Sequence, residues 1–243
     1  MAPALTDQAI AKIKDLIMSG EFSAGARLPR EQDLAARLGL SRNSLREAVR
    51  ALALIGVLDT RVGDGTYVTS LDADVLLMGM GFVGDLLEGT TLLEVHRVRK
   101  ILEPVATGLA ATRLTEEGFL ALEACLQEMD EAETTQAFVD ADSEFHRIIV
   151  AAADNATLAS IIQSLSGGMM RARLWRSITE HGAAEITKQR HRDILEALRA
   201  RDAEQASAAD LLHLADGERW LAQRIAAGKT LNGGELAGSA RSV

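Results

Sequence analysis

The stretch from Leu28 to Leu54 constrains the fold more than any other part of this sequence, because it contains two short segments with helical apolar spacing and a glycine between them. Gly39 can adopt the left-handed conformation that ends a helix, and Ser41 can cap the helix that follows. Apolar side chains recur at spacings of three and four on both sides of this turn: Leu34, Ala35, Leu38, Leu45, Ala48, Val49 and Leu52. The pattern predicts two helices joined by a tight turn.

The second predicted helix leaves its polar side chains free to contact a partner. These side chains are Arg42, Asn43, Ser44, Arg46 and Arg50, and Ser41 at the cap is a further candidate for DNA contact. Guanidinium groups pair with guanine, amide groups pair with adenine, and hydroxyl groups reach phosphates. The segment is therefore predicted to be a helix-turn-helix whose second helix enters the major groove of DNA. An ordinary helical hairpin with a solvated basic face is the alternative.

The neighbouring segments extend this pattern into a winged helix-turn-helix. A helix is expected over residues 6–18, before the helix pair. After the pair, residues 57–62 and 66–69 have strand character and are joined by a tight glycine-rich turn. Gly65 in this turn would allow a close approach to a phosphate or to the minor groove. A hairpin without DNA contact is the alternative, because the turn contains no Arg or Lys.

The charge distribution agrees with a DNA-binding segment, although the net charge of the chain is −9. Residues 1–70 carry a net charge of +1, whereas the remaining residues carry −10. DNA contact requires local basic clustering rather than a basic chain. A single cysteine, Cys125, excludes an internal disulfide and fits the reducing cytoplasm, where we expect the protein to act. The longest apolar run, residues 75–84, is too short to span a membrane, and the polar start predicts no signal peptide.

The pattern becomes helical beyond a hinge around residues 70–74 and stays so to about residue 228. Helices are expected over residues 75–87, 91–113, 115–133, 135–153, 156–180, 183–200 and 203–228. Residues 229–243 lack periodicity and are expected to be disordered. We therefore predict a mainly α protein. Residues 1–72 form a winged helix-turn-helix with a small β-hairpin wing, and residues 73–228 form an all-α bundle of six to seven helices.

Four residues in the predicted bundle form a candidate metal site. Asp142 and His146 are four residues apart, so both lie on one face of their helix. His191 and His213 each lie about eleven residues, or roughly 16 Å along a helix, from the turn expected near residue 201. They would therefore lie level with each other on two antiparallel helices. A carboxylate and three imidazoles suit a divalent transition metal with open positions; as an alternative, each histidine is an ordinary surface or core residue.

Residues 6–70 resemble the DNA-binding domain of the GntR family of bacterial transcription regulators. The matching residues are Gly25, Leu28-Pro29, Glu31, Leu34-Ala35, Leu38, Ser41-Arg42, Leu45-Arg46-Glu47-Ala48, Leu52, Gly56 and Gly63-Asp64-Gly65-Thr66-Tyr67-Val68. The resemblance implies that Arg42 and Arg46 are the main base and phosphate contacts. Arg30 stands where a capping Ser, Thr or Pro is usual, and Gln32 stands where many members have another DNA-contacting arginine. Both residues are expected to face DNA.

Residues 92–215 look like the FCD ligand-binding domain of the FadR subfamily. The matching pieces are Val98-Arg99, Leu102-Glu103-Pro104, Leu109-Ala110-Ala111, Asp142, Phe145-His146, Ile149, Ala152, Asn155, Leu158, His191, Ile194-Leu195, Ala197-Leu198, Asp202, Ala206 and His213-Leu214. Metal-containing members use an Asp and three His, which carry over onto Asp142, His146, His191 and His213. The resemblance implies zinc, with nickel, manganese or iron as other metals, and a small carboxylate effector held by the metal and by Arg99. Arg99 could instead pair internally with Glu103.

These expectations combine into a bacterial, ligand-responsive transcription regulator that is not an enzyme. We expect a homodimer on an inverted-repeat operator in double-stranded DNA, acting more often as a repressor, with no membrane partner. Two alternatives stay open. The metal itself could be the sensed signal, or the four residues could hold the catalytic metal of a small hydrolase or oxygenase, although no general base stands at a fixed spacing from them.

Overall fold

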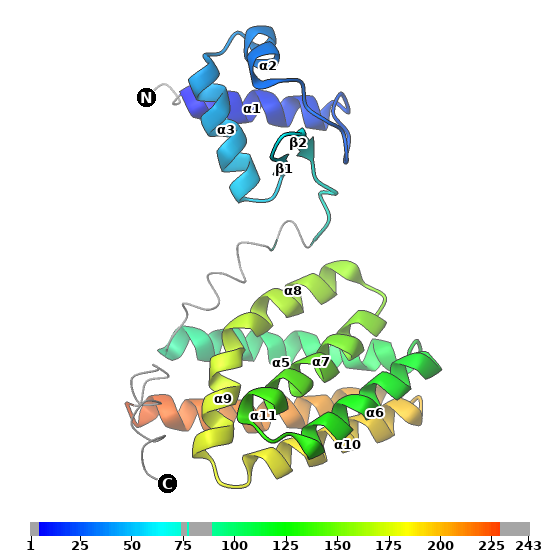
Figure 1. The fold of residues 1–243 in the computed structure, drawn as a ribbon. Coiled ribbons are helices and arrows are strands. Elements are labelled where there is room, and N and C mark those ends of the chain that lie inside the picture. The colour runs from blue at the N-terminus through cyan, green and yellow to red at the C-terminus, as the bar shows by residue number, and fades with distance from the viewer. Residues whose placement is uncertain (1–4, 74–76, 78–88, 229–243) are drawn as a thin grey trace. The chain divides into compact units, whose positions relative to one another are not determined.

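The computed structural model of the protein describes residues 5–73, 77 and 89–228. The chain divides into two compact units, Met1–Gly79 and Met80–Val243 (Figure 1). The described residues are mainly helical and contain a two-stranded sheet, so the predicted fold class is confirmed. None of the described helices is long and apolar enough to cross a membrane. The helix expected over residues 75–87, except for residue 77, and the tail from residue 229 lie outside the described residues.

The first unit contains the predicted helix-turn-helix and wing. Its elements are α1 (Leu5–Met18), α2 (Glu31–Leu38), α3 (Arg42–Leu54), β1 (Leu58–Arg61) and β2 (Gly65–Val68). Gly39 ends α2 with a left-handed φ of 65°, and the Ser41 hydroxyl accepts a hydrogen bond from the Ser44 N–H at the start of α3. The strands pair antiparallel, with Arg61 opposite Gly65 at the wing turn. The turn, the helix cap and the hairpin therefore form where the sequence predicted them.

An aliphatic core holds this unit together. α1 packs against α3, and the short strands close one side of the core. The buried side chains come from all three helices, both strands and the loop before α2: Ala9, Ile13, Leu28, Leu34, Ala35, Leu45, Ala48, Val49, Leu52, Leu58 and Val68. Because α3 buries this apolar face, the polar side chains on its opposite face stay available to a partner.

The second unit is a bundle of helices. Its elements are α5 (Gly89–Ala111), α6 (Glu116–Glu131), α7 (Thr135–Ala152), α8 (Ala156–Ser166), the 3-10 turn η1 (Gly167–Met169), α9 (Met170–Thr179), α10 (Ala183–Arg199) and α11 (Ala203–Ala226). α5 packs along α11, and α6 packs on α7 and α10 (Figure 1). Cys125 is buried in the largest apolar cluster of this bundle, as expected for a core residue.

The single helix expected over residues 156–180 is wrong. The chain leaves α8 after Ser166, passes through one 3-10 turn at Gly167 and Gly168, and continues as α9 in a different direction (Figure 1). Two adjacent glycines have the lowest helix propensity apart from proline and favour a break in the helix. This break turns α9 toward α7, against which it packs.

Candidate metal centre and nucleic-acid interface

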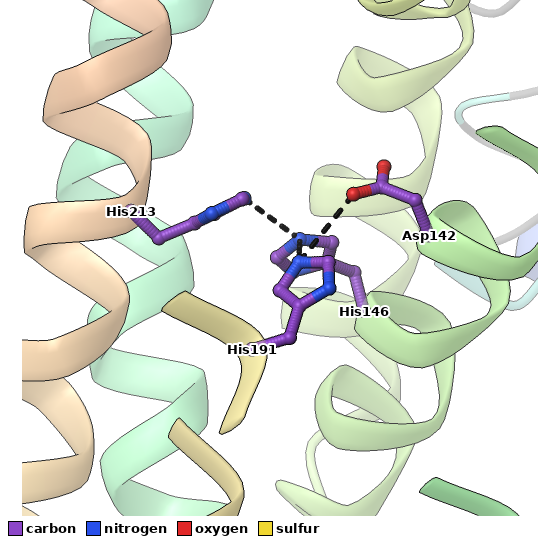
Figure 2. Close-up of side chains that lie close together, drawn as sticks. All are labelled: Asp142, His146, His191 and His213. Carbon is purple, nitrogen blue, oxygen red and sulfur yellow. Dashed lines mark hydrogen bonds and ion pairs between the residues drawn. The ribbon is translucent and has the colours of Figure 1, made fainter. Parts of the chain in front are cut away.

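Four side chains from three helices meet inside the bundle: Asp142 and His146 from α7, His191 from α10 and His213 from α11 (Figure 2). Their ligand atoms all lie within 4.8 Å of one another. His146 Nε2 is 3.1 Å from His213 Nε2 and 3.2 Å from His191 Nε2. Asp142 Oδ1 is 3.4 Å from His191 Nε2. The structure thus brings together all four residues that the sequence assigned to one site, and His191 and His213 lie level as predicted.

The spacing of these donor atoms fits a transition-metal ion. Ligands about 2.0–2.1 Å from an ion are separated by roughly 2.9–3.4 Å when they subtend angles of about 90–110° at the ion. The three separations above, 3.1, 3.2 and 3.4 Å, fall within this range. These three separations therefore agree with donors that share one ion, and the remaining pairs lie within 4.8 Å.

Burial keeps the three imidazoles neutral. His191 is fully buried, and desolvation lowers its pKa to about 4. Desolvation also lowers the pKa of His146 and of His213 well below the usual value, and the neighbouring imidazoles lower both further. A neutral imidazole has the lone pair that a metal ion requires. Phe145 stacks on His191 with ring centroids 4.5 Å apart and so restrains the orientation of that ring.

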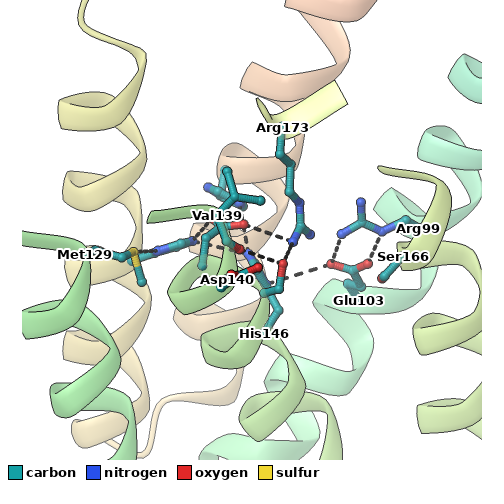
Figure 3. A network of polar contacts seen from close by, with 12 residues as sticks. Arg99, Glu103, Met129, Val139, Asp140, His146, Ser166 and Arg173 are labelled. Carbon is teal, nitrogen blue, oxygen red and sulfur yellow. Dashed lines mark hydrogen bonds and ion pairs between the residues drawn. The ribbon is translucent and has the colours of Figure 1, made fainter. Parts of the chain in front are cut away.

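Buried ion pairs surround the cluster (Figure 3). Arg99 Nε and Nη2 donate to Glu103 Oε1 and Oε2 at 2.5 and 3.0 Å, and both side chains are 1% exposed. Glu103 Oε2 lies 4.0 Å from His146 Nδ1. Arg173 Nη1 lies 2.9 Å from Asp142 Oδ2, but this oxygen has no aligned hydrogen-bond donor, so the contact is one of charge. Arg99 therefore neutralises a carboxylate beside the cluster, whereas Arg173 lies against the carboxylate that belongs to the cluster.

A cavity of about 60 Å³ adjoins the cluster, enough for a few water molecules or a small organic anion. Asp142 and His213 line it, and its other charged lining residues are Arg99, Arg173 and Arg176. Each of these arginines already lies against a carboxylate, that of Glu103, Asp142 and Glu180 respectively, so an anion that binds here would share or replace one of these ion pairs. The sequence left two positions open for Arg99, at the ligand cavity or in an internal pair with Glu103. In the structure Arg99 both lines the cavity and pairs with Glu103.

Two further residues lie at this cavity. His96 is one of its lining residues, and His96 Nε2 lies 2.8 Å from the carbonyl oxygen of Leu214. Arg173 was not expected. It lies on α9, beyond the break at residues 167–169, and periodicity within a helix carries no information about contacts made after such a break.

The side chains predicted to contact DNA gather around a groove in the first unit. The groove lies between the start of α2, the start of α3 and the wing, and its lining includes Arg30, Gln32, Arg42 and Gly65. Outside this lining, Ser41, Asn43 and Arg50 are exposed near the same face of α3.

Two of the predicted DNA-contacting residues have partners within the unit. Arg46 is half-buried, and its Nε donates to Glu31 Oε2 at 3.1 Å, which restrains its guanidinium. Ser44 is only 9% exposed, and its hydroxyl lies 2.8 Å from that of Ser41. Ser44 therefore takes part in the helix cap, whereas the sequence analysis had placed its hydroxyl on the outer face.

Arg27 is a groove residue that the sequence analysis did not identify. It donates a hydrogen bond to the backbone carbonyl of Asp64 at the wing tip. A Cβ atom at Gly65 would come within 2.7 Å of Arg27 Nε, so glycine makes room for the guanidinium. The Arg27 side chain is nevertheless 59% exposed. The wing turn has no basic residue of its own, but a guanidinium from a distant part of the sequence lies against it.

Comparisons with known proteins cover both units. Residues 5–68 match the family described as bacterial regulatory proteins, gntR family, and residues 94–216 match the FCD domain. A probable D-xylose utilization operon transcriptional repressor from Paenarthrobacter nicotinovorans is 34% identical over 214 residues, which cover 84% of this chain and 85% of that protein. The galactonate operon transcriptional repressor of Escherichia coli (strain K12) is 26% identical over 226 residues, covering 89% and 96%. A solved structure, Streptococcus agalactiae GntR, aligns with a TM-score of 0.57 at 28% identity, covering 88% of this chain and 99% of that one.

Proposed function

We propose a function on the premise that this chain belongs to the GntR family of bacterial regulatory proteins, whose members bind DNA operators. The chain is a transcription regulator with an N-terminal DNA-binding domain and an FCD domain, and it is not an enzyme. Within that function, we infer that a small carboxylate bound at a divalent metal in the second unit controls operator binding. We also infer that the control is repression.

The observation that carries this proposal is the four-residue cluster beside an arginine-lined cavity. Asp142, His146, His191 and His213 would hold the ion, and zinc is the best match to this nitrogen-rich set, with nickel, manganese and iron as alternatives. When bound, the metal supplies an electrophilic attachment point for carboxylate oxygens. A doubly charged ion with one carboxylate ligand keeps a net positive charge. In a buried site that charge favours an anionic ligand.

The names of two relatives point to different ligand classes. One name refers to D-xylose utilization and the other to galactonate, which is a carboxylate. Three arginines line the cavity of this chain, and guanidinium donors suit a carboxylate better than a neutral sugar. Arg99 would then pair with the carboxylate group of the effector, at the expense of its contact with Glu103.

The groove of the first unit supports a specific mode of DNA contact. Arg42 lies at the start of α3, where it can enter the major groove and read a guanine. Arg46 is held by Glu31 close to the same end of the helix. Arg27 lies at the wing turn, where a guanidinium can reach a phosphate or the minor groove. Recognition would thus combine base reading by α3 with charge contacts from the wing.

An exposed apolar strip supports a homodimer through the second unit. On α5, Val98, Ile101 and Val105 are 43%, 67% and 56% exposed, and Leu211 on the adjacent α11 is 43% exposed. Pairing this strip with its copy would bury it and give the twofold symmetry that an inverted-repeat operator requires. The effector would then change the spacing of the two recognition helices.

If the apolar strip is the dimer interface, an Ile101→Asp variant should sediment as a monomer at concentrations at which the wild type is a dimer.

Operator titration tests the proposal directly. A duplex that the purified protein selects from a random library serves as the operator. Fluorescence anisotropy then measures how tightly this duplex binds metal-free protein and zinc-loaded protein. The zinc-loaded protein is also measured with acetate, lactate, citrate or galactonate. The proposal expects that a carboxylate weakens operator binding only when zinc is present. A response to zinc alone would identify a metal sensor. No response to any carboxylate, in protein that contains the metal, would contradict control by a carboxylate.

A further inference from the structure

Glu103 lies between the residue that faces the cavity, Arg99, and the cluster residue His146 (Figure 3). Resting on the function proposed above, we propose that Glu103 is a positioning residue with two alternative partners. Without a carboxylate ligand it binds Arg99. With a carboxylate ligand on Arg99, it accepts a hydrogen bond from His146 Nδ1 and so strengthens the metal site.

The first partner is fixed by the structure. Arg99 and Glu103 are four residues apart on α5, and both carboxylate oxygens accept from the guanidinium. Each side chain is only 1% exposed, so solvent cannot replace either partner. A buried carboxylate left without any partner is strongly disfavoured. Glu103 must therefore find another donor whenever Arg99 leaves it.

The second partner follows from the orientation of His146. Its Nε2 points to His191 and His213, whereas its Nδ1 faces Glu103 Oε2 at 4.0 Å. A neutral imidazole has one N–H, so a metal on Nε2 places the proton on Nδ1. Histidines that bind metals almost always donate this second N–H to a carboxylate, a carbonyl or water, which orients the ring and raises its basicity. A shift of about 1 Å would bring the carboxylate to hydrogen-bond distance.

Competition for Arg99 links the two partners. Each bidentate edge of a guanidinium holds one carboxylate at a time, and Glu103 occupies the Nε–Nη2 edge of Arg99, which also lines the cavity. A ligand carboxylate that takes this edge releases Glu103 toward His146. Carboxylate binding would then increase metal affinity, and by thermodynamic reciprocity the metal would increase carboxylate affinity by the same factor.

Asp210 on α11 is the competing acceptor. It lies with Glu103 and His146 in a second buried group whose ligand atoms are within 4.8 Å of one another. Thr107 Oγ1 donates to Asp210 Oδ2 at 2.8 Å, while Asp210 Oδ1 has no hydrogen-bond partner among the described residues. Asp210→Asn therefore distinguishes the two carboxylates beside His146.

The experiment measures zinc affinity of the full chain by competition with a chelator, with and without saturating acetate. Glu103→Gln should weaken zinc binding by about ten- to a hundredfold, as expected for the loss of a carboxylate behind a metal-bound histidine. Acetate should also raise zinc affinity less than in the wild type, because only the direct contact of acetate with the metal remains. Glu218→Gln is the matched control, because Glu218 also pairs with cations of α5, Arg97 and Lys100, outside the site. It should behave as the wild type.

Two results would overturn the inference while leaving the proposed metal site intact: wild-type zinc affinity and acetate response in Glu103→Gln, or loss of zinc affinity only in Asp210→Asn. A wild-type protein that binds no zinc would instead reject the metal site as well. If Glu103→Gln does not fold, nitrogen-15 NMR of the zinc-loaded wild type decides. With acetate bound, His146 should carry its proton on Nδ1, with a strongly downfield, slowly exchanging signal; a rapidly exchanging Nδ1 proton would contradict the inference.

Discussion

The arginines of the first unit are mostly solvated, whereas several arginines of the second unit are buried against carboxylates. Arg27 is 59% exposed at the wing, while Arg99 is 1% exposed beside Glu103. DNA brings its own high density of negative charge, so solvated cations on a surface are sufficient to bind it. A small anion must instead be taken out of water into a pocket whose charges are already paired. Its binding therefore has to rearrange existing ion pairs.

This difference in charge pairing explains how the first unit can bind DNA while the second unit responds to a small anion. Removing one surface arginine from the first unit leaves no buried group unpaired, so the fold survives and only DNA binding changes. In the second unit a new charge changes which buried groups are paired, and buried networks respond as a whole. Such a response can be transmitted as a change of conformation.

Acid should destabilise the second unit of the metal-free protein strongly. Burial lowers the pKa of His96 and of His191 to about 4, so their unfolded forms bind protons near pH 6.5 and their folded forms only near pH 4. Between these values each such histidine reduces stability by up to about 1.4 kcal/mol per pH unit as the pH falls. His146 and His213 act in the same direction.

One buried carboxyl group opposes this effect. Burial raises the pKa of Asp210 to about 7, so its folded form binds a proton first and stability rises as the pH falls from 7 toward 4. It offsets about one histidine, and a net loss remains. Urea unfolding at pH 7.5 and at pH 5, followed by tryptophan fluorescence, measures this net loss of stability. The signal reports on the second unit because both tryptophans, Trp175 and Trp220, belong to it. Equal urea midpoints at the two pH values would contradict this prediction. The first unit should not show this effect, because it has no histidine.

His146→Ala should lower zinc affinity by more than about a hundredfold, because it removes a ligand of the metal. Loss of a residue that only supports a ligand already lowers metal affinity by about ten- to a hundredfold. Elemental analysis of the purified protein and chelator competition check this, and circular dichroism should show unchanged helical content. The matched control is His181→Ala, since His181 is an exposed histidine outside the cluster. Full metal occupancy in His146→Ala would mean that the ligand set is wrong.

Arg42→Ala should reduce specific operator binding by about 1–3 kcal/mol if its guanidinium reads a guanine, without changing zinc affinity. Anisotropy titrations on the selected operator and on the same duplex with that base pair changed separate reading from simple attraction. Lys14→Ala, an exposed change on α1 that does not line the groove, is the control. Unchanged discrimination between the two duplexes would remove Arg42 from the reading role.

Arg27→Ala should have the smallest effect, a loss of a few-fold that is similar for all DNA sequences. Its expected signature lies in the salt dependence of DNA binding. The slope of log affinity against log salt concentration should become shallower by about one if the guanidinium contacts one phosphate. Affinity is measured at four or five salt concentrations for the wild type and the variant. An identical slope would show that Arg27 only supports the wing turn through the carbonyl of Asp64.

The sequence predicted the parts of both sites that depend on spacing within one helix or across one turn. Gly39 and Ser41 mark the helix-turn-helix because end signals are local. Asp142 and His146 share a face because four residues make about one helical turn. His191 and His213 lie level because each is about the same number of residues from the short turn that joins α10 and α11.

Contacts between distant parts of the chain could not be predicted in this way. Arg27 reaches Asp64 across 37 residues of sequence, and no periodicity relates the two. Arg173 reaches Asp142 only because the chain bends at Gly167, a break that the apolar pattern alone does not reveal. Ser44 has the right position for DNA contact, but its short side chain hydrogen-bonds within the first turn of its own helix.

The most direct test of the central claim, that the second unit controls the first, is a reciprocal binding measurement. Carboxylate binding to zinc-loaded protein can be followed by tryptophan fluorescence, because Trp220 lines the cavity. The account predicts that saturating operator DNA raises the dissociation constant of the carboxylate by the same factor by which the carboxylate raises that of the operator. An unchanged carboxylate affinity in the presence of operator would contradict coupling between the two units.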